Sequence, residues 1–291
     1  MKTFFSAFVL MLPLCVWSQN ERLLSQEIGI KDPQVFDQHM ITVPGIGKDP
    51  RDMLDVQTIK PYMMPVRKVS TEGEELAYTI ASALEYYVNL NENYKINLSP
   101  DYISLNLLAS NKTVTAKDAL QLLVDEGTVS ASIMPYGSRT IPPAVYATQK
   151  YTIQNFLYLF RDVTRPSQRS FETRKALMRG NPVVIEFNAH PRIKDLLYTT
   201  ELDMSKKAEW ASKAVEVKYL DASLLIADEN KDDETKSYPF IVVGYDDNLE
   251  AFEVLSSWGR VWGSSGYIWI KYKDFEEFAT SGYVVVPQTE Y

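Results

Sequence analysis

Hydrophobic positions are densest between residues 73 and 90, in the stretch GEELAYTIASALEYYVNL, where they recur on most sides of a helical wheel. The pattern predicts one long helix that is buried in the core instead of lying on the surface. Thr71 and Glu74 have the spacing of a capping box, and Glu72, Glu74 and Glu75 stand where a helix dipole favours negative charge. Taken alone, these residues indicate a capped core helix with acidic side chains at its start.

Helical patterns continue after this stretch and then give way to strands. Ser99-Pro100 opens a segment with a Leu/Ile stripe, DALQLLVDEG is an amphipathic run closed by Gly127, and residues 171–180 predict a helix leading into the strand PVVIEF. The run QNFLYLF fits either a short helix or a strand. YPFIVVGYDD, AFEVLSSWG, GYIWIKY and YVVV each predict a strand. Because helices come first and strands later, the expected fold class is α+β, and residues 191–237 follow no clear pattern.

The N-terminal part of the chain has the patterns of an export signal and an arm. Residues 1–18 combine a basic start at Lys2, an apolar run that is too short to span a bilayer, and small residues before a cleavage point. They predict a signal peptide. Residues 19–60 are polar and interrupted by proline and glycine, which predicts an extended N-terminal arm. The arm either lies across the main domain, residues 61–291, or serves as a tail that binds a partner.

Composition excludes several functions. The chain has 30 Lys and Arg against 38 Asp and Glu, a net charge of −8, which argues against nucleic acid as a partner. No second apolar run is long enough to cross a bilayer, so we do not expect an integral membrane protein. The only cysteine, Cys15, lies in the predicted signal peptide, and the mature chain therefore lacks a thiol nucleophile. Because no His, Asp and Glu cluster has metal-ligand spacing, we expect no metal and no other cofactor.

Two separated motifs resemble those of papain-like cysteine peptidases. YPFIVVGYDD followed by SSWGRVWGSSGYIWIKY is similar to the family's H-A-V-x-x-V-G-Y and N-S-W-G-x-x-W-G-x-x-G-Y, and PVRKVSTEGEELAY aligns without gaps with P-V-K-N-Q-G-S-C-G-S-C-W-A-F. The resemblance covers residues 65–291. It implies a helical half with a long buried central helix, packed on an antiparallel β-barrel-like half. The retained frame residues are Trp258, Gly259, Trp262, Gly263, Gly266 and Tyr267.

The residues that carry the family's chemistry are all replaced. The resemblance puts Glu75 at the nucleophile position, Tyr238 at the base position, Ser256 at the position of the orienting Asn and Val69 at that of the oxyanion-stabilising Gln. Neither histidine, His39 or His190, stands at a family position. A glycine pair that lets substrate backbone approach falls at Thr113 and Val114, whose β-branched side chains are expected to crowd the cleft.

Three functions are compatible with this pattern. The first is an exported, catalytically inactive pseudo-peptidase that binds or scaffolds protein partners in a bacterial cell-envelope or secreted assembly, in the periplasm, at the cell surface or outside the cell, with the arm as its contact element. The second is a peptide-binding chaperone, decoy or inhibitor that uses the former cleft. The third is a hydrolase with a rewired Glu75/Tyr238 site.

Overall fold

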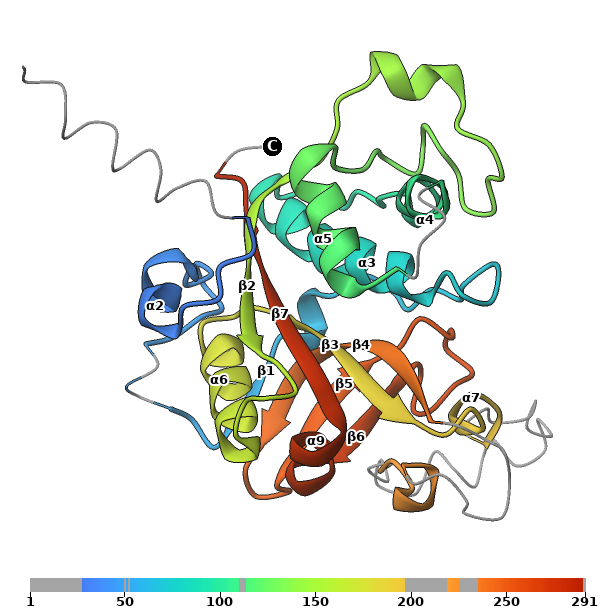
Figure 1. Ribbon diagram of the computed structural model, residues 1–291. Coiled ribbons are helices and arrows are strands. Elements are labelled where there is room, and N and C mark those ends of the chain that lie inside the picture. Colours follow the sequence, from blue (N-terminus) through green and yellow to red (C-terminus); the bar gives the residue numbers. More distant parts are fainter. Residues whose placement is uncertain are drawn as a thin grey trace, which may run out of the picture.

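The computed structural model describes residues 28–49, 51, 53–109, 114–196, 219–225 and 235–289, so the predicted signal peptide and Thr113 lie outside the described residues. Helices α3 (Glu75–Asn91), α4 (Pro100–Leu108) and α5 (Ala116–Asp125) pack together in one half of the molecule, shown at the top of Figure 1. The predicted central helix is α3. Its Ile80, Ala81, Leu84 and Val88 side chains are completely buried.

The start of α3 differs from the expected capping box. The helix begins at Glu75 with Glu74 as its N-cap residue, and no side chain caps it. Gly73 adopts a positive φ of 92°, which places its N–H 2.8 Å from Oε2 of Glu75. Thr71 and Glu74 instead both bind the Arg139 guanidinium. Because these two side chains are used by a distant arginine, the spacing that fits a capping box does not produce one.

The other half is a seven-stranded sheet in which every pairing between strands is antiparallel. Its order is β2-β7-β3-β4-β5-β6, and β1 pairs with β4. The strands are β1 (Val56–Thr58), β2 (Ile153–Phe160), β3 (Val183–Ala189), β4 (Lys236–Asp246), β5 (Ala251–Leu255), β6 (Tyr267–Lys271) and β7 (Ala279–Pro287). The ambiguous run QNFLYLF is therefore a strand, held by its antiparallel partner β7. The α+β architecture expected from the sequence is confirmed.

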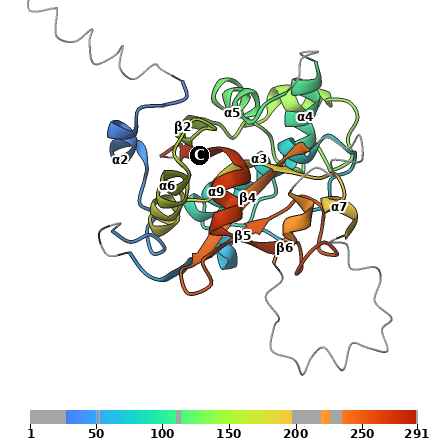
Figure 2. The ribbon, with the colours of Figure 1, turned by 60° about the horizontal axis from the view of Figure 1, so that its bottom comes forward.

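Short helices connect and cover the sheet. They are α2 (Phe36–His39), α6 (Pro166–Met178), α7 (Ile193–Leu196), α9 (Tyr272–Phe278) and the 3-10 turns Pro33–Val35, Lys60–Tyr62, Pro143–Ala147 and Ala222–Leu224. Helix α6 begins five residues before the predicted 171 because Pro166, in its first turn, fixes a helical φ. In both views α2 lies beside β2 and α6 (Figures 1 and 2).

The described part of the arm packs against the domain. Phe36, Met40, Val43 and Ile59 are buried within the main hydrophobic core, and β1 is a strand of the sheet. Backbone groups also meet closely, since the Val43 N–H donates to the carbonyl of Arg179 at 2.8 Å. Residues 28–49 and 53–60 thus contribute to the same core as the helices and the sheet.

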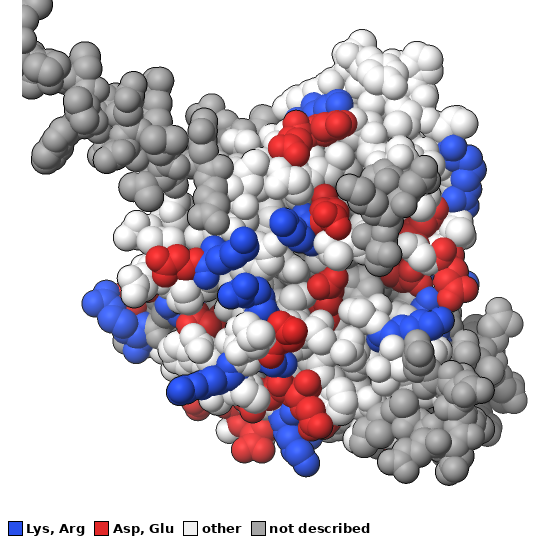
Figure 3. All heavy atoms as spheres, viewed as in Figure 1, with Lys and Arg blue, Asp and Glu red and all other residues white. Residues whose placement is uncertain are grey.

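Charged side chains are mixed on the molecular surface. On the face drawn in Figure 3, basic and acidic residues alternate over the region of α2, α6 and β1, without an extended field of one sign. This face therefore offers no extended patch of a single charge to a partner.

Candidate functional site

The two halves meet at the first turn of α3, where the segment before the helix lies against the loop after β5. Lys68 forms an antiparallel bridge with Trp258, and the Val69 N–H donates to the carbonyl of Ser257 at 2.8 Å. This pairing brings the nucleophile position, Glu75, to the region that holds the Trp258 side chain. The segment before α3 and the loop after β5 are therefore neighbours in space.

Glu75 is held in an ion pair with Lys194 of α7. The Lys194 ammonium donates to Oε1 of Glu75 at 2.5 Å and to Glu72 at 3.2 Å. Trp258 Nε1 lies 3.5 Å from the same Oε1 atom, and the Gly73 N–H binds Oε2. Both carboxylate oxygens of Glu75 thus accept hydrogen bonds, and its side chain is only 9% exposed.

The charged forms of both partners are favoured. Burial alone would raise the pKa of Glu75, but the Lys194 hydrogen bond and the backbone N–H groups outweigh it and lower the pKa from its usual 4.5. Burial likewise opposes the charge of Lys194, yet its bonds to Glu75 and Glu72 raise the pKa of the ammonium from 10.5. Both groups are charged at neutral pH, so Glu75 is a weak proton acceptor.

Tyr238, at the base position on β4, is buried and contacts the same ion pair from one side. Its ring packs edge-on against Trp258 with 5.5 Å between centroids. The Lys194 ammonium lies 5.4 Å from the centroid of Tyr238 and 5.8 Å from that of Trp258, within range of cation–π attraction. Lys194 therefore interacts with both members of the proposed Glu75/Tyr238 pair.

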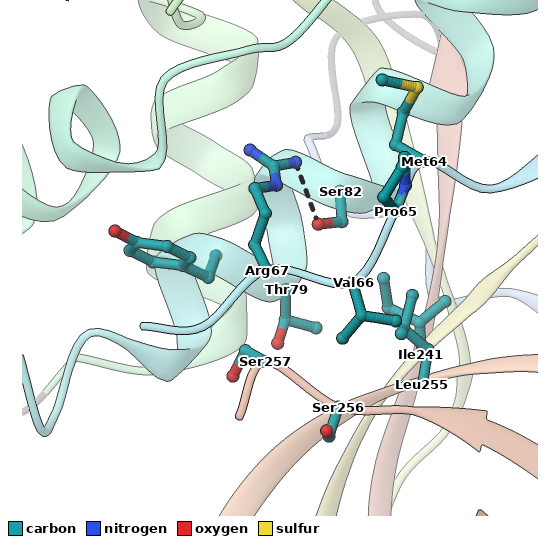
Figure 4. Close-up of a pocket in the computed structure, with 11 residues that line it drawn as sticks. Met64, Pro65, Val66, Arg67, Thr79, Ser82, Ile241, Leu255, Ser256 and Ser257 are labelled. Carbon is teal, nitrogen blue, oxygen red and sulfur yellow. Dashed lines mark hydrogen bonds between the residues drawn. The ribbon is translucent and has the colours of Figure 1, made fainter. Parts of the chain in front are cut away.

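Ser256 and Val69 have structural contacts. The Ser256 hydroxyl donates to the carbonyl of Gly266 at 3.2 Å and lies 3.4 Å from the Trp258 N–H, which holds the loop between β5 and β6. Val69 is half-buried and packs on the main core. Figure 4 shows Ser256 at the wall of a cavity of about 10 Å³ between the strand ends and the segment before α3, which is no larger than a single water.

The retained aromatic and glycine residues maintain the frame. Trp262 is fully buried, and its indole N–H donates to the carbonyl of Ile193 at 3.1 Å, which fixes α7 and hence Lys194. Gly266 adopts a φ of +90° against Val66, where a Cβ would come within 2.5 Å of the valine side chain. Gly259 and Gly263, in the same loop, also have positive φ, and Tyr267, the first residue of β6, is buried beneath the Lys60 ammonium.

Val114, His39 and His190 do not line the hollow beside Glu75. Val114 is half-buried and packs on the core, and Thr113 lies outside the described residues, so crowding of the cleft by this pair stays a prediction. His39 ends α2, whereas His190 is buried beside α7 and its Nδ1 accepts the Arg192 N–H at 3.1 Å. Sequence reasoning missed Lys194, because it lies in the stretch without a clear pattern and the family alignment assigns it no role.

A hollow of about 410 Å³ adjoins the ion pair. It is lined by Lys68, Val69, Glu72, Glu75, Pro191, Lys194, Lys236, Tyr238 and Trp258, and we call it the site hollow. Three of the four replaced positions, Glu75, Tyr238 and Val69, border it, whereas Ser256 lines the small cavity instead. Within the described ranges, no group of three or more His, Cys, Asp or Glu side chains is arranged to hold a metal ion.

Solved structures resemble this fold along most of the chain. Xylellain, a cysteine protease from Xylella fastidiosa, is 17% identical with a TM-score of 0.58 and covers 89% of this chain and 94% of its own. A procathepsin B from Trypanosoma congolense is 13% identical with a TM-score of 0.58, over 91% of this chain and 88% of its own. Digestive procathepsin L 3 of Tenebrio molitor larval midgut is 14% identical with a TM-score of 0.56, over 87% of this chain and 77% of its own.

These similarities show that the chain has a papain-like fold, as its two motifs predict. No protein-family model and no curated protein sequence matches the chain. Among the residues that the structure describes, no helix is both long and apolar enough to cross a membrane.

Proposed function

We propose that this chain is an exported, catalytically inactive pseudo-peptidase that serves as a binding or scaffolding component of a bacterial cell-envelope or secreted assembly. The ion pair between Lys194 and Glu75 carries the proposal. Papain-like catalysis depends on a thiolate activated by a histidine. A carboxylate already bound by an ammonium supplies neither the thiolate nor the proton transfer.

The remaining substitutions support the same conclusion. Val69 has no side-chain donor for an oxyanion, and loss of one such donor typically lowers the rate by about a hundredfold or more. The Ser256 hydroxyl is engaged in its own loop. A hydrolase that uses Glu75 as its base is disfavoured, because the lowered pKa of Glu75 makes it a weak base and Lys194 occupies its Oε1 atom.

The arm supplies the proposed surface for protein partners. Between the arm and α6 lies an open groove of about 650 Å³, which we call the arm–α6 groove. Apolar side chains on or near it are exposed, including Phe171 at 50% and Val56, on the adjoining strand β1, at 45%. Exposed apolar surface flanked by charged residues is typical of protein contacts. The groove is lined by Asp37, Thr42, Asp49, Arg51, Met53, Phe171, Lys175 and Arg179.

A pull-down from the native host with mass spectrometry tests this proposal. Deleting residues 19–60 would remove buried core residues, so surface variants are the better probe. The variant Val56→Ser/Phe171→Ser should lose the captured partner, whereas Leu108→Ser/Tyr146→Ser, changed at side chains 59% and 78% exposed, should retain it. If the wild type captures no partner, or if both variants retain it, the scaffolding proposal fails.

Export is the second element of the proposal. It rests on the sequence of residues 1–18, which lie outside the described residues. Fractionation of the native host with N-terminal sequencing should recover a chain that starts at Gln19, outside the cytoplasm. A full-length chain in the cytoplasm would contradict it.

The site hollow supports a second candidate function, binding of a peptide without cleavage. A volume of about 410 Å³ lies within the range of roughly 300 to 1,000 Å³ that is usual for ligand sites. The hollow is open beside the Glu75–Lys194 pair, so a segment of a partner protein could lie there without meeting a reactive group. This function is compatible with a scaffolding role.

A further inference from the structure

The site hollow is bordered by basic side chains, although the chain as a whole carries a net charge of −8. Lys68 and Lys236 line it, and Arg192 lies between two lining residues, Pro191 and Lys194. Arg260 follows Gly259, the glycine that lies against Lys68. We call these four residues the basic rim: Lys68 and Lys236, which line the hollow, and Arg192 and Arg260, which adjoin it along the chain.

The charges of the basic rim are available to a ligand. All four side chains are exposed, and within the described part of the chain none of them forms an ion pair with another residue. Among the residues that the structure describes, the acidic side chains lining the hollow are Glu72 and Glu75, and Lys194 binds both. These two carboxylates carry one negative charge more than Lys194, and the four positive charges of the basic rim exceed that difference, so positive charge predominates among the described residues around the hollow.

We infer that the site hollow binds an acidic peptide segment, whose Asp or Glu carboxylates pair with the basic rim. The inference rests on the peptide-binding role proposed above and names its ligand. Complementary charge steers partners to a concave surface and selects among them. A long nucleic acid fits poorly, because beyond the hollow its phosphates would meet the surface of an acidic chain. The local reversal of charge favours a short carboxylate ligand.

Fluorescence polarisation with three labelled peptides tests the inference. The probes are a ten-residue peptide of alternating Glu and Ala and its counterparts with Gln or Lys in place of Glu. The Glu peptide should bind the wild-type protein, more weakly as salt is raised, and the other two should not. Equal binding of the Glu and Gln peptides, or no binding of the Glu peptide at about 1 mM, would overturn the inference.

Two charge-matched variants locate the contact. Lys68→Glu/Lys236→Glu should weaken binding of the Glu peptide by about tenfold or more. Lys95→Glu/Lys273→Glu makes the same change of net charge at exposed lysines that do not line the hollow, and should change the affinity by less than about twofold. Both variants alter exposed positions, and thermal unfolding checks that they fold. If the two variants weaken binding equally, the basic rim is not the binding site.

A single-stranded DNA probe of equal charge separates acidic peptide from polyanions in general. Tighter binding of the DNA than of the peptide would overturn the assignment to a peptide. Failure of this inference is also distinguishable from failure of the pseudo-peptidase proposal. Absent peptide binding leaves the inactive scaffold standing if a partner is still captured through the arm–α6 groove, whereas peptide turnover would remove the pseudo-peptidase whatever the affinity of the Glu peptide.

Discussion

Lys194 of α7 donates a 2.5 Å hydrogen bond to Glu75, the first residue of α3, and so joins the central helix to the short helix after β3. Trp262 holds the backbone of α7 through the carbonyl of Ile193. Glu75, which the family resemblance predicts at the nucleophile position, is thus part of a buried ion pair, supported by Trp262.

Breaking this ion pair should reduce stability. The side chains of Glu75 and Lys194 are 9% and 20% exposed, so Lys194→Met leaves the Glu75 carboxylate without its cation, and Glu75→Gln leaves Lys194 with Glu72 alone. We expect each to lower the free energy of unfolding by about 1–3 kcal/mol, measured by urea denaturation. The double variant should lose clearly less than the sum of the two. Strictly additive losses would show that the two residues do not interact.

The ion pair also predicts how stability depends on pH. Because folding lowers the pKa of Glu75, its contribution is present above the usual value of 4.5 and is lost as the pH falls through the lowered pKa. Folding raises the pKa of Lys194, so its contribution is present below 10.5 and is lost as the pH rises through the raised pKa. Melting temperatures measured from pH 3 to 7 should fall less steeply on acidification in Glu75→Gln/Lys194→Met than in the wild type. Identical profiles would contradict this assignment.

A second buried ion pair, between Arg67 and Glu85, should contribute more to stability than an exposed ion pair does. Arg67 binds Glu85 inside the helical half, where the side chains are 12% and 0% exposed, and the Leu98 N–H donates to Glu85 at 2.6 Å. Burial raises the pKa of Glu85 to about 7 even beside Arg67, so Arg67→Met should leave this carboxyl protonated at neutral pH and cost about 1–3 kcal/mol through the lost ion pair. The control, Arg51→Met, breaks a pair with Asp49 whose side chains are 88% and 43% exposed, and should cost much less than Arg67→Met. Similar losses of unfolding free energy in Arg67→Met and Arg51→Met would contradict this difference between the buried and the exposed ion pair.

The contact between the arm and the domain should be sensitive to one methyl group. A Cβ added at Gly47 would lie 2.2 Å from the carbonyl oxygen of Arg179, whereas one added at Gly45, in the same turn, would meet nothing within 4 Å. Gly45 has a φ of +76°, so Gly45→Ala should cost only the roughly 1–2 kcal/mol of that conformation. We expect Gly47→Ala to cost more than Gly45→Ala, since backbone must move to admit the methyl group. A smaller loss for Gly47→Ala in thermal unfolding would mean that the arm is loosely attached.

The fold was predictable because its signals are local or lie in well-spaced motifs. The apolar stretch of α3, the alternation of the C-terminal strands and the Trp-Gly motif around Trp258 all predict elements that the structure contains. The helix start was not predictable from spacing alone, because Thr71 and Glu74 bind Arg139 from a segment more than 60 residues away. The contact between Lys194 and α3 could not be predicted for the same reason. No pattern in residues 191–237 indicates which of their side chains contacts that helix.

That Glu75, Tyr238 and Ser256 replace the family's chemical residues stays a prediction from the resemblance, and only the structure shows what their side chains contact. The alignment locates Glu75 and Tyr238, and it says nothing of the ammonium that contacts both. From the sequence, Ser256 fits a replacement for the orienting residue and an ordinary loop residue equally well. The structure shows its hydroxyl bound to the Gly266 carbonyl within the loop. The basic rim likewise unites residues from four separate segments, which sequence order does not bring together.

The most direct test of the central claim is a search for peptide cleavage. The purified mature protein should be incubated from pH 4 to 9 with a defined mixture of synthetic peptides, and the products identified by mass spectrometry, with Glu75→Gln prepared in parallel. We predict no products beyond those of the buffer control for either protein, because the Glu75 carboxylate is held by Lys194 and no thiol is present after signal removal. Cleavage by the wild type that disappears in Glu75→Gln would contradict the account.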